Sequence, residues 1–154
     1  MKLPAKGSCQ CGQVQCELTS EPLFSYACHC HDCQKRTGSA FSMGLVCLAD
    51  GVLLNGKLSS WTRTSEDGHT NTRYSCADCG NIIYGASTAS EGLWKLQTGL
   101  LEDTAELHPE VHIWICRKQQ WISLPADVPV YERQPTDLSD LLTDALAYRE
   151  SAGS

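Results

Sequence analysis

Cysteine spacing constrains this chain more than any other feature of its sequence. Three thiols fall within six residues, at Cys28, Cys30 and Cys33, in a C-x-C-x-x-C pattern. Residues two apart in an extended segment share a face, so Cys28 and Cys30 can point together, and a tight turn can bring Cys33 back to the same point. Three converging sulfur ligands with an open fourth position are typical of a working zinc site, whereas four protein ligands are typical of a structural one.

Two further pairs of thiols have metal-ligand spacing. Cys9 and Cys11 form a second C-x-C that lies between glycines, and Cys76 and Cys79 form a C-x-x-C with glycine behind it. The second pair has the usual half-site spacing of a zinc ribbon. The simplest partition closes one structural site with these two pairs and leaves the three-cysteine group with a metal of its own. Such a closed site contributes folding free energy, on the order of 10 kcal/mol in small zinc peptides.

A rival partition uses the same thiols differently. Cys30 and Cys33 could share a metal with Cys76 and Cys79 as an ordinary zinc ribbon, which would leave Cys9, Cys11 and Cys28 without a site. Copper(I) or an iron–sulfur cluster shares the preference of zinc for thiolate ligands. We expect zinc, with two ions per chain.

The open site has a consequence for charge. Three thiolates on Zn²⁺ leave a net charge of about −1, which suits an incoming thiol that binds as thiolate and serves as a nucleophile. Lys35 and Arg36 directly follow the cluster. They are candidates to neutralise the site and to hold a carboxylate of an anionic thiol substrate. The alternative for both cations is a solvated loop.

Length, charge and cysteine content limit the remaining classes. A chain of 154 residues suits one domain with a real core. The net charge of −6 argues against nucleic acid as a partner. No apolar run approaches the roughly 18 residues that would span a bilayer, and the first residues contain no apolar signal region. We therefore expect a cytoplasmic location, where ten cysteines indicate metal ligands before disulfides.

Hydrophobic periodicity predicts short strands and turns along most of the chain. Apolar and polar residues alternate at 14–18, apolar segments at 40–48, 82–84, 93–97 and 112–116 are strand-like, and 65–68 is a polar turn. Helical spacing appears only after residue 136, with aspartates between the leucines. The prediction is a mainly β domain at 1–135, followed by an acidic C-terminal helix and tail at 136–154.

Residues outside the three cysteine groups receive less specific predictions. Free cysteine behaves as a small hydrophobe, so Cys16, Cys47 and Cys116 are expected in the core. The four tryptophans are expected there as well. His29 and His31 alternate with the ligand cysteines and should face away from them, so we do not expect them to bind the metal.

The motifs together resemble the glutathione-dependent formaldehyde-activating enzyme family, which includes the centromere protein V relatives. The matching segments are GSCQCGQV at 7–14, CHCHDCQKRTGSAF at 28–41, YSCADCG at 74–80 and PEVHIW at 109–114. Their order and spacing cover roughly residues 7 to 135. The chain departs from the shared pattern at Gln34, where arginine or tryptophan is common, and in the acidic helix after residue 136.

The resemblance implies a fold, a metal content and a reaction. It implies a small zinc-bound, β-sandwich-like (β-tent) domain with two zincs. It assigns Cys9, Cys11, Cys76 and Cys79 to the structural metal, and Cys28, Cys30 and Cys33 to the functional one. It also implies that glutathione, or a similar small thiol, condenses with formaldehyde or a related aldehyde to give S-hydroxymethylglutathione, which is a carbon–sulfur lyase reaction run in reverse. The competing hypothesis is a non-catalytic two-zinc module that binds another protein, and a homodimer is left open.

Overall fold

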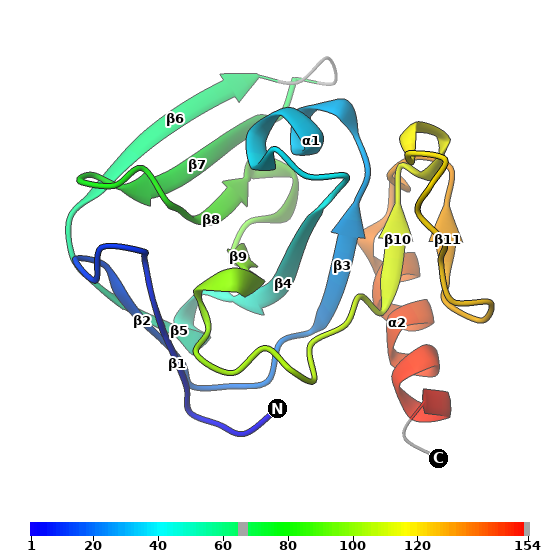
Figure 1. The fold of residues 1–154 in the computed structure, drawn as a ribbon, viewed down its shortest axis with the longest axis horizontal. Coiled ribbons are helices and arrows are strands. Elements are labelled where there is room, and N and C mark those ends of the chain that lie inside the picture. The colour runs from blue at the N-terminus through cyan, green and yellow to red at the C-terminus, as the bar shows by residue number, and fades with distance from the viewer. Residues whose placement is uncertain (65–67, 153–154) are drawn as a thin grey trace. The chain divides into compact units, whose positions relative to one another are not determined.

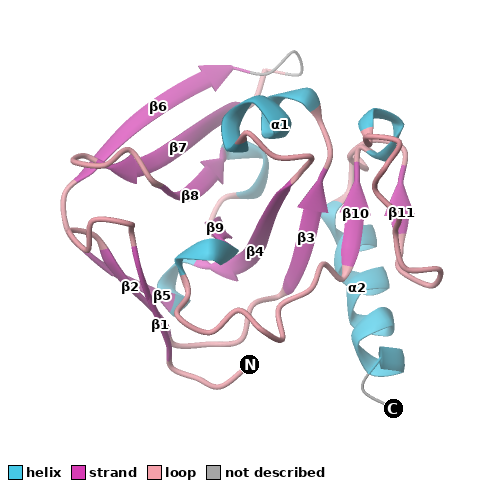
Figure 2. Ribbon diagram, in the orientation of Figure 1, coloured by secondary structure: helices cyan, strands magenta, loops and turns pink. Residues whose placement is uncertain are grey.

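The computed structural model describes residues 1–64 and 68–152, and there the fold is mainly β with a C-terminal helix, as predicted (Figure 2). The predicted polar turn at 65–68 lies outside the described residues except for Gly68, as do the last two residues of the predicted tail. The chain forms two compact units. The first unit comprises Met1–Leu23 and Leu45–Leu107, and the second comprises Phe24–Gly44 and the described residues from His108 onward.

The first unit contains a small antiparallel sheet and a meander of longer strands. The small sheet has the order β1-β2-β5, with bounds β1 (Ala5–Ser8), β2 (Gln15–Leu18) and β5 (Val52–Asn55). The meander runs antiparallel through neighbouring strands (Figure 1): β6 (Leu58–Thr64), β7 (Thr70–Cys76), β8 (Ile82–Ser87) and β9 (Leu93–Gln97). Strand β4 (Ser42–Leu48) carries the chain from the second unit back into the first.

One hydrophobic core fills the first unit, and its pattern follows the strand period. Cys16 and Leu18 of β2 point inward while Gln15 is exposed, as the alternation predicted. Cys47 is also buried. On β7, β8 and β9 the rings of Tyr74, Tyr84 and Trp94 stack in sequence, with centroids 4.5 and 4.0 Å apart. These rings pack against the buried leucines and valines and close the core on that side.

The second unit has parallel strands with a helix packed on them. Its strand order is β11-β10-β3, with bounds β3 (Phe24–Cys28), β10 (Val111–Ile113) and β11 (Val130–Tyr131). Its helices are α1 (His31–Thr37) and α2 (Leu138–Ala152). Helix α2 packs against β3 and β10 and buries Leu141 and Ala145. The helical spacing after residue 136 therefore marks the face that covers this unit.

Short 3-10 helices join several strands of the two units. They are η1 (Ala49–Gly51), η2 (Thr88–Ser90), η3 (Thr98–Leu100) and η4 (Ile115–Arg117). Among the described residues, no helix has both the length and the apolar character needed to cross a bilayer. The cytoplasmic location and the domain boundary at residue 136 stay predictions.

Three core predictions are wrong. Strand β10 ends at Ile113 rather than at residue 116, because Trp114 adopts a left-handed conformation with φ of 62° and the chain enters η4. The strand period is lost there, and Cys116 is exposed rather than buried. Trp61 and Trp121 are also exposed, by 59% and 72%, because β6 is an edge strand of the meander and residue 121 lies in a loop.

Candidate metal centres

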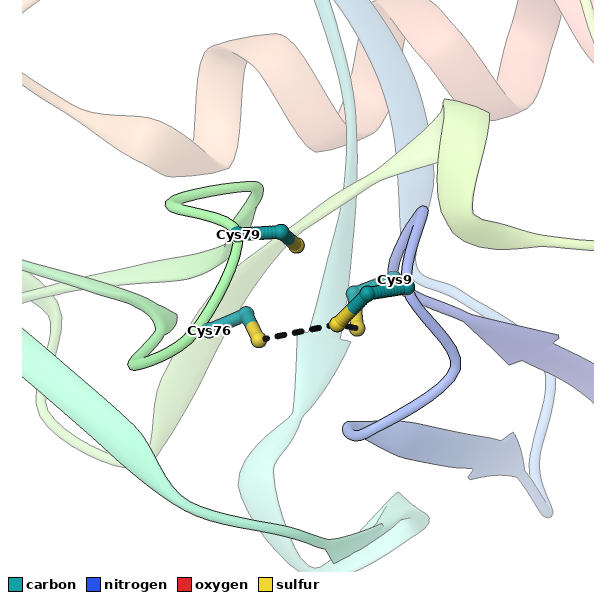
Figure 3. A group of neighbouring side chains, drawn as sticks. Cys9, Cys76 and Cys79 are labelled. Atoms are coloured by element: carbon teal, nitrogen blue, oxygen red, sulfur yellow. Dashed lines mark hydrogen bonds between the residues drawn. The ribbon is translucent and has the colours of Figure 1, made fainter.

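The first unit brings together the two cysteine pairs that lie farthest apart in the sequence. Cys9 and Cys11 lie in the turn between β1 and β2, Cys76 ends β7, and Cys79 lies in the following turn. Figure 3 shows the side chains of Cys9, Cys76 and Cys79 pointing toward one another. All four sulfurs lie within 4.8 Å of one another.

The spacing of these sulfurs fits one tetrahedral metal ion. A Zn–S bond of about 2.3 Å places the sulfurs of a tetrahedral site about 3.8 Å apart. The Sγ atoms of Cys9 and Cys11 are 3.5 Å apart, and those of Cys11 and Cys76 are 3.7 Å apart. These two separations are close to the value that a tetrahedral zinc site requires.

Two glycines let both loops turn tightly around the sulfurs. Gly12 and Gly80 have φ angles of 79° and 73°, a left-handed conformation that glycine adopts without a steric penalty. Each donates its N–H to the carbonyl of the first cysteine of its pair, at 2.9 and 3.0 Å. The loops are joined by the Gln10 N–H, which donates to Oδ1 of Asn81 at 3.1 Å. The backbone thus holds both half-sites in register.

The electrostatics of this group also favour a cation. Burial raises the pKa of Cys9, but the Val14 N–H, 3.2 Å from its sulfur, and the neighbouring thiols outweigh burial and lower the pKa to about 6. For Cys11, the Gln13 amide lowers the pKa, yet the Cys9 sulfur and burial raise it to about 12. The group therefore favours the thiolate at Cys9 and disfavours it at Cys11, so holding all four sulfurs as thiolates needs a positive ion among them.

The second cysteine group lies entirely in the second unit. Cys28 is the last residue of β3, Cys30 caps the N-terminus of α1, and Cys33 lies in its first turn. Their three sulfurs lie within 4.8 Å of one another, and across residues 1–64 and 68–152 no fourth cysteine, histidine or carboxylate ligand joins them. Cys28 and Cys33 are buried, whereas Cys30 is partly exposed, so solvent reaches the group on the Cys30 side.

Arg36 contacts this cluster directly. Its Nη2 lies 3.5 Å from Sγ of Cys33 and donates to the hydroxyl of the buried Ser42 at 2.7 Å. The thiols of Cys28 and Cys30, and then the Arg36 guanidinium, lower the pKa of Cys33. Lys35, the other cation predicted near the site, lies exposed on α1. The structure thus brings one of the two predicted cations to the cluster and leaves the other on the helix surface.

One of the histidines beside the cluster cysteines in the sequence belongs to a buried histidine pair. His29 is fully buried, its Nε2 is 2.9 Å from Nδ1 of His112, and its ring packs 5.3 Å from that of Phe41. Burial lowers the pKa of both histidines, to about 4 for His112, which favours the neutral form of each ring. Nδ1 of His29 is buried without a partner, so a proton on its Nε2 avoids an unpaired N–H. Among the described residues, His29 is not one of those that group with the three cysteines.

Sequence reasoning missed the amide that fastens α1. Gln34 Nε2 donates to the carbonyls of His29 and Arg117, at 2.7 and 2.9 Å, and Gln34 Oε1 accepts from Nε2 of Gln119 at 3.3 Å. These contacts hold the helix that carries Cys33 against the segment after β10. Two of the partners lie more than 80 residues away in the chain, so no local pattern marks them.

The family comparison agrees with this geometry. A sequence model described as glutathione-dependent formaldehyde-activating enzyme matches residues 4–117, which is more than half of the chain. The chain belongs to this family. The matched range contains all seven clustered cysteines and ends before β11 and α2.

Individual relatives of this family member are distant. Two fungal proteins, from Penicillium rubens and Emericella nidulans, are provisionally named glutathione-dependent formaldehyde-activating enzymes and are 32% and 31% identical over 77 residues. Those matches cover 50% of this chain but only 40% and 39% of the fungal proteins, so the chain spans about two fifths of their length. A crystal structure of a Rhodobacter sphaeroides protein matches 68% of this chain and 91% of its own, with a TM-score of 0.52 at 19% identity, which supports the fold.

Proposed function

We propose that this family member is a zinc enzyme that adds a small thiol, such as glutathione, to formaldehyde or a related aldehyde. The observation that carries the proposal is the convergence of Cys28, Cys30 and Cys33 with no fourth ligand among the described residues. Family membership and the provisional names of the fungal relatives support the choice of thiol and aldehyde. Cys9, Cys11, Cys76 and Cys79 would hold a second, structural zinc.

The proposed reaction forms one carbon–sulfur bond. The thiol loses its S–H proton, and the thiolate sulfur attacks the carbonyl carbon of formaldehyde. The π electron pair of the carbonyl moves to oxygen, which takes up a proton to give the hydroxymethyl thioether. No oxidant or reductant is needed, and the reverse reaction is that of a carbon–sulfur lyase. Zinc, when bound, would supply Lewis acidity that lowers the pKa of the thiol to near neutrality.

The chain's own residues would keep this site charged and ordered. The three cysteines supply thiolate ligands, and the partly exposed Cys30 leaves access for the substrate. The Arg36 guanidinium, 3.5 Å from Cys33, offsets the excess negative charge that a thiolate substrate would add. The neutral His29–His112 pair adds no positive charge that would compete with the metal.

The test pairs metal content with product formation. Wild-type protein is expected to hold two zinc ions per chain by elemental analysis and to accelerate S-hydroxymethylglutathione formation from ¹³C-formaldehyde, followed by NMR, above the spontaneous rate. Cys30→Ser should hold one zinc, stay folded and lose the acceleration, because the first unit keeps its own metal. Cys116→Ser is the matched control, since that thiol is exposed and lies outside both groups.

Two results would decide against the proposal. If wild-type protein with two zincs gives no acceleration, the chain is better described as a two-zinc protein-interaction module. If Cys30→Ser keeps full activity, the reaction does not depend on the three-cysteine group.

A further inference from the structure

Strand β6 leaves one edge of the meander open. Among the strands that the structure describes, β6 ends the strand order and pairs only with β7 (Figure 1). Its residues from Ser59 to Thr64 are all exposed. An edge strand presents unpaired backbone N–H and C=O groups, and natural proteins commonly protect such an edge with proline, a bulge or several charges. Strand β6 has no proline and one charged residue, Arg63, and its pairing with β7 runs without a register shift.

The hydrogen-bond pattern of β6 shows which of its backbone groups face the open edge. The Ala77 N–H donates to the Lys57 carbonyl at 3.0 Å, and these two residues continue the β6–β7 register. Hydrogen-bonded and non-hydrogen-bonded pairs alternate along an antiparallel ladder, so the odd-numbered residues of β6 exchange bonds with β7. The N–H and C=O groups of Ser60 and Thr62 therefore point to the open edge.

The side chains of β6 leave this edge uncharged by acids and rich in apolar surface. The Thr62 hydroxyl lies 2.9 Å from that of Thr72, and the Ser59 hydroxyl donates to the Ser75 carbonyl at 3.5 Å, so both are directed to β7. Trp61, at the centre of β6, is 59% exposed. The strand contains no aspartate or glutamate, although the chain has a net charge of −6. Two copies of this acidic chain can therefore approach here without opposed carboxylates on the strand.

We propose that β6 pairs with β6 of a second copy of this chain, antiparallel and with a two-fold axis at Trp61. This register overlaps the whole of both strands. It places Ser60 opposite Thr62 of the second copy, so the outward-facing backbone groups of each pair can exchange two hydrogen bonds. Trp61 then faces Trp61 of the second copy in a non-hydrogen-bonded pair, where side chains come closest and an aromatic pair is favourable. Arg63 faces Ser59 of the second copy, so like charges are not opposed.

The position of Trp61 favours a second copy over an unrelated strand. The middle of β6, its exposed aromatic ring and the outward-facing Ser60 and Thr62 are all centred on the same residue. One two-fold rotation therefore satisfies the open backbone edge and covers the ring at the same time. Pairing of one surface with itself about a two-fold axis is also the commonest arrangement of soluble oligomers.

Sedimentation equilibrium of the zinc-loaded protein tests this pairing. At about 0.1 mM, where complexes of micromolar affinity form, wild-type protein should have about twice the mass of one chain. Thr62→Pro removes the outward N–H, which an edge strand tolerates, and should be monomeric. Thr62→Ala loses the same hydroxyl but keeps that N–H, so it should stay dimeric. Trp61→Lys should raise the dissociation constant about tenfold or more, whereas Trp121→Lys, at the exposed tryptophan of a loop, should not.

Hydrogen exchange followed by NMR tests where the contact lies. The amides of Ser60 and Thr62 should exchange more slowly as the protein concentration rises, whereas the Trp61 amide, which bonds to β7, should not change. Trp61→Lys alters an exposed side chain and is expected to stay folded by circular dichroism, so it decides the question if Thr62→Pro does not fold. The inference is overturned if wild-type protein is monomeric at this concentration, if Trp61→Lys dimerises as tightly as wild type, or if a dimer forms without protecting the Ser60 and Thr62 amides.

Discussion

Replacing Arg149 with methionine should loosen the C-terminal helix from the second unit. Glu110 is 7% exposed, and its Oε2 accepts hydrogen bonds from the Ser25 N–H at 2.7 Å, the Ser25 hydroxyl at 3.0 Å and Nη2 of Arg149 at 3.0 Å. Its Oε1 accepts from Nε of Arg149. Arg149 lies in α2, so this ion pair joins the helix to the segment before β10. The substitution would leave a buried carboxylate without its counter-charge.

The expected loss in the free energy of unfolding depends on how deeply Glu110 and Arg149 are each buried. Breaking a fully buried ion pair costs about 3–5 kcal/mol, and hydrogen bonds to a charged group contribute about 1.5–3 kcal/mol. The Arg149 side chain is 36% exposed, so water partly replaces it, and both bonds from Ser25 remain. We therefore expect Arg149→Met to lower the free energy of unfolding by about 2 kcal/mol at pH 7.

The loss should depend on pH with a defined sign. Burial raises the pKa of Glu110, but Arg149 and the Ser25 amide outweigh it and lower the folded-state pKa below that of the unfolded chain. Its stabilising contribution is therefore present above the unfolded pKa of about 4.3 and is lost as pH falls through the folded value. In Arg149→Met burial acts without the guanidinium, so protonation relieves the penalty. The difference between the two proteins should be largest at neutral pH and shrink on acidification.

Urea denaturation of the zinc-loaded proteins at pH 7 and pH 4 would measure this difference. Arg133→Met is the matched control, because the Arg133 guanidinium lies 5.8 Å from the Trp114 ring centre in the same unit and should contribute less than about 1 kcal/mol. A loss for Arg149→Met below about 0.5 kcal/mol, or one that stays the same at both pH values, would refute the account of Glu110 as a buried, paired carboxylate.

Two other substitutions test the first unit. Gly7→Ala would place a Cβ 2.3 Å from the Leu100 carbonyl oxygen, so we expect a loss of about 1–3 kcal/mol and a lower melting temperature. Gly99→Ala, whose Cβ would meet nothing within 4 Å, is the control, and equal melting temperatures for the two variants would contradict the close approach. Cys76→Ser should lose one zinc and the circular dichroism of the folded unit, and a folded variant with two zincs would rule out a structural role for that metal.

The sequence predicted those parts of the fold that local patterns encode. Alternation at β2 and helical spacing in α2 reported which side chains face the core, and the cysteine spacing gave the same two groups that the structure brings together. The alternation of apolar and polar residues does not show where a strand ends when the strand is ended by the backbone conformation of one residue. Strand β10 ends early because Trp114 adopts a left-handed conformation. Nor does an aromatic residue in a strand-like segment reveal whether its face is covered, as exposed Trp61 shows.

Contacts between segments that are distant in the sequence could not be predicted for a different reason. The parallel pairing of β10 with β3 joins residues more than 80 positions apart, and Gln34 reaches Arg117 across the same separation. Glutamine and glutamate are common on exposed surfaces, so Gln34 and Glu110 carry no signal that they are fixed in place. Only the fold shows that the two side chains join segments of the second unit.

The two cysteine groups differ in what a metal would do for the fold. Cys9 and Cys76 are 67 positions apart, so an ion bound by both closes a long loop, and closing a long loop lowers the conformational entropy of the chain. Binding of the ion offsets this entropic cost, so removing the ion should destabilise the folded first unit. Cys28 and Cys33 lie five positions apart and are already held by β3, by the turns of α1 and by Arg36. A metal there closes almost no loop and contributes little to folding. Under the proposed function, the three-cysteine group would therefore be able to exchange a ligand during a reaction cycle, while a metal in the four-cysteine group would keep the first unit folded.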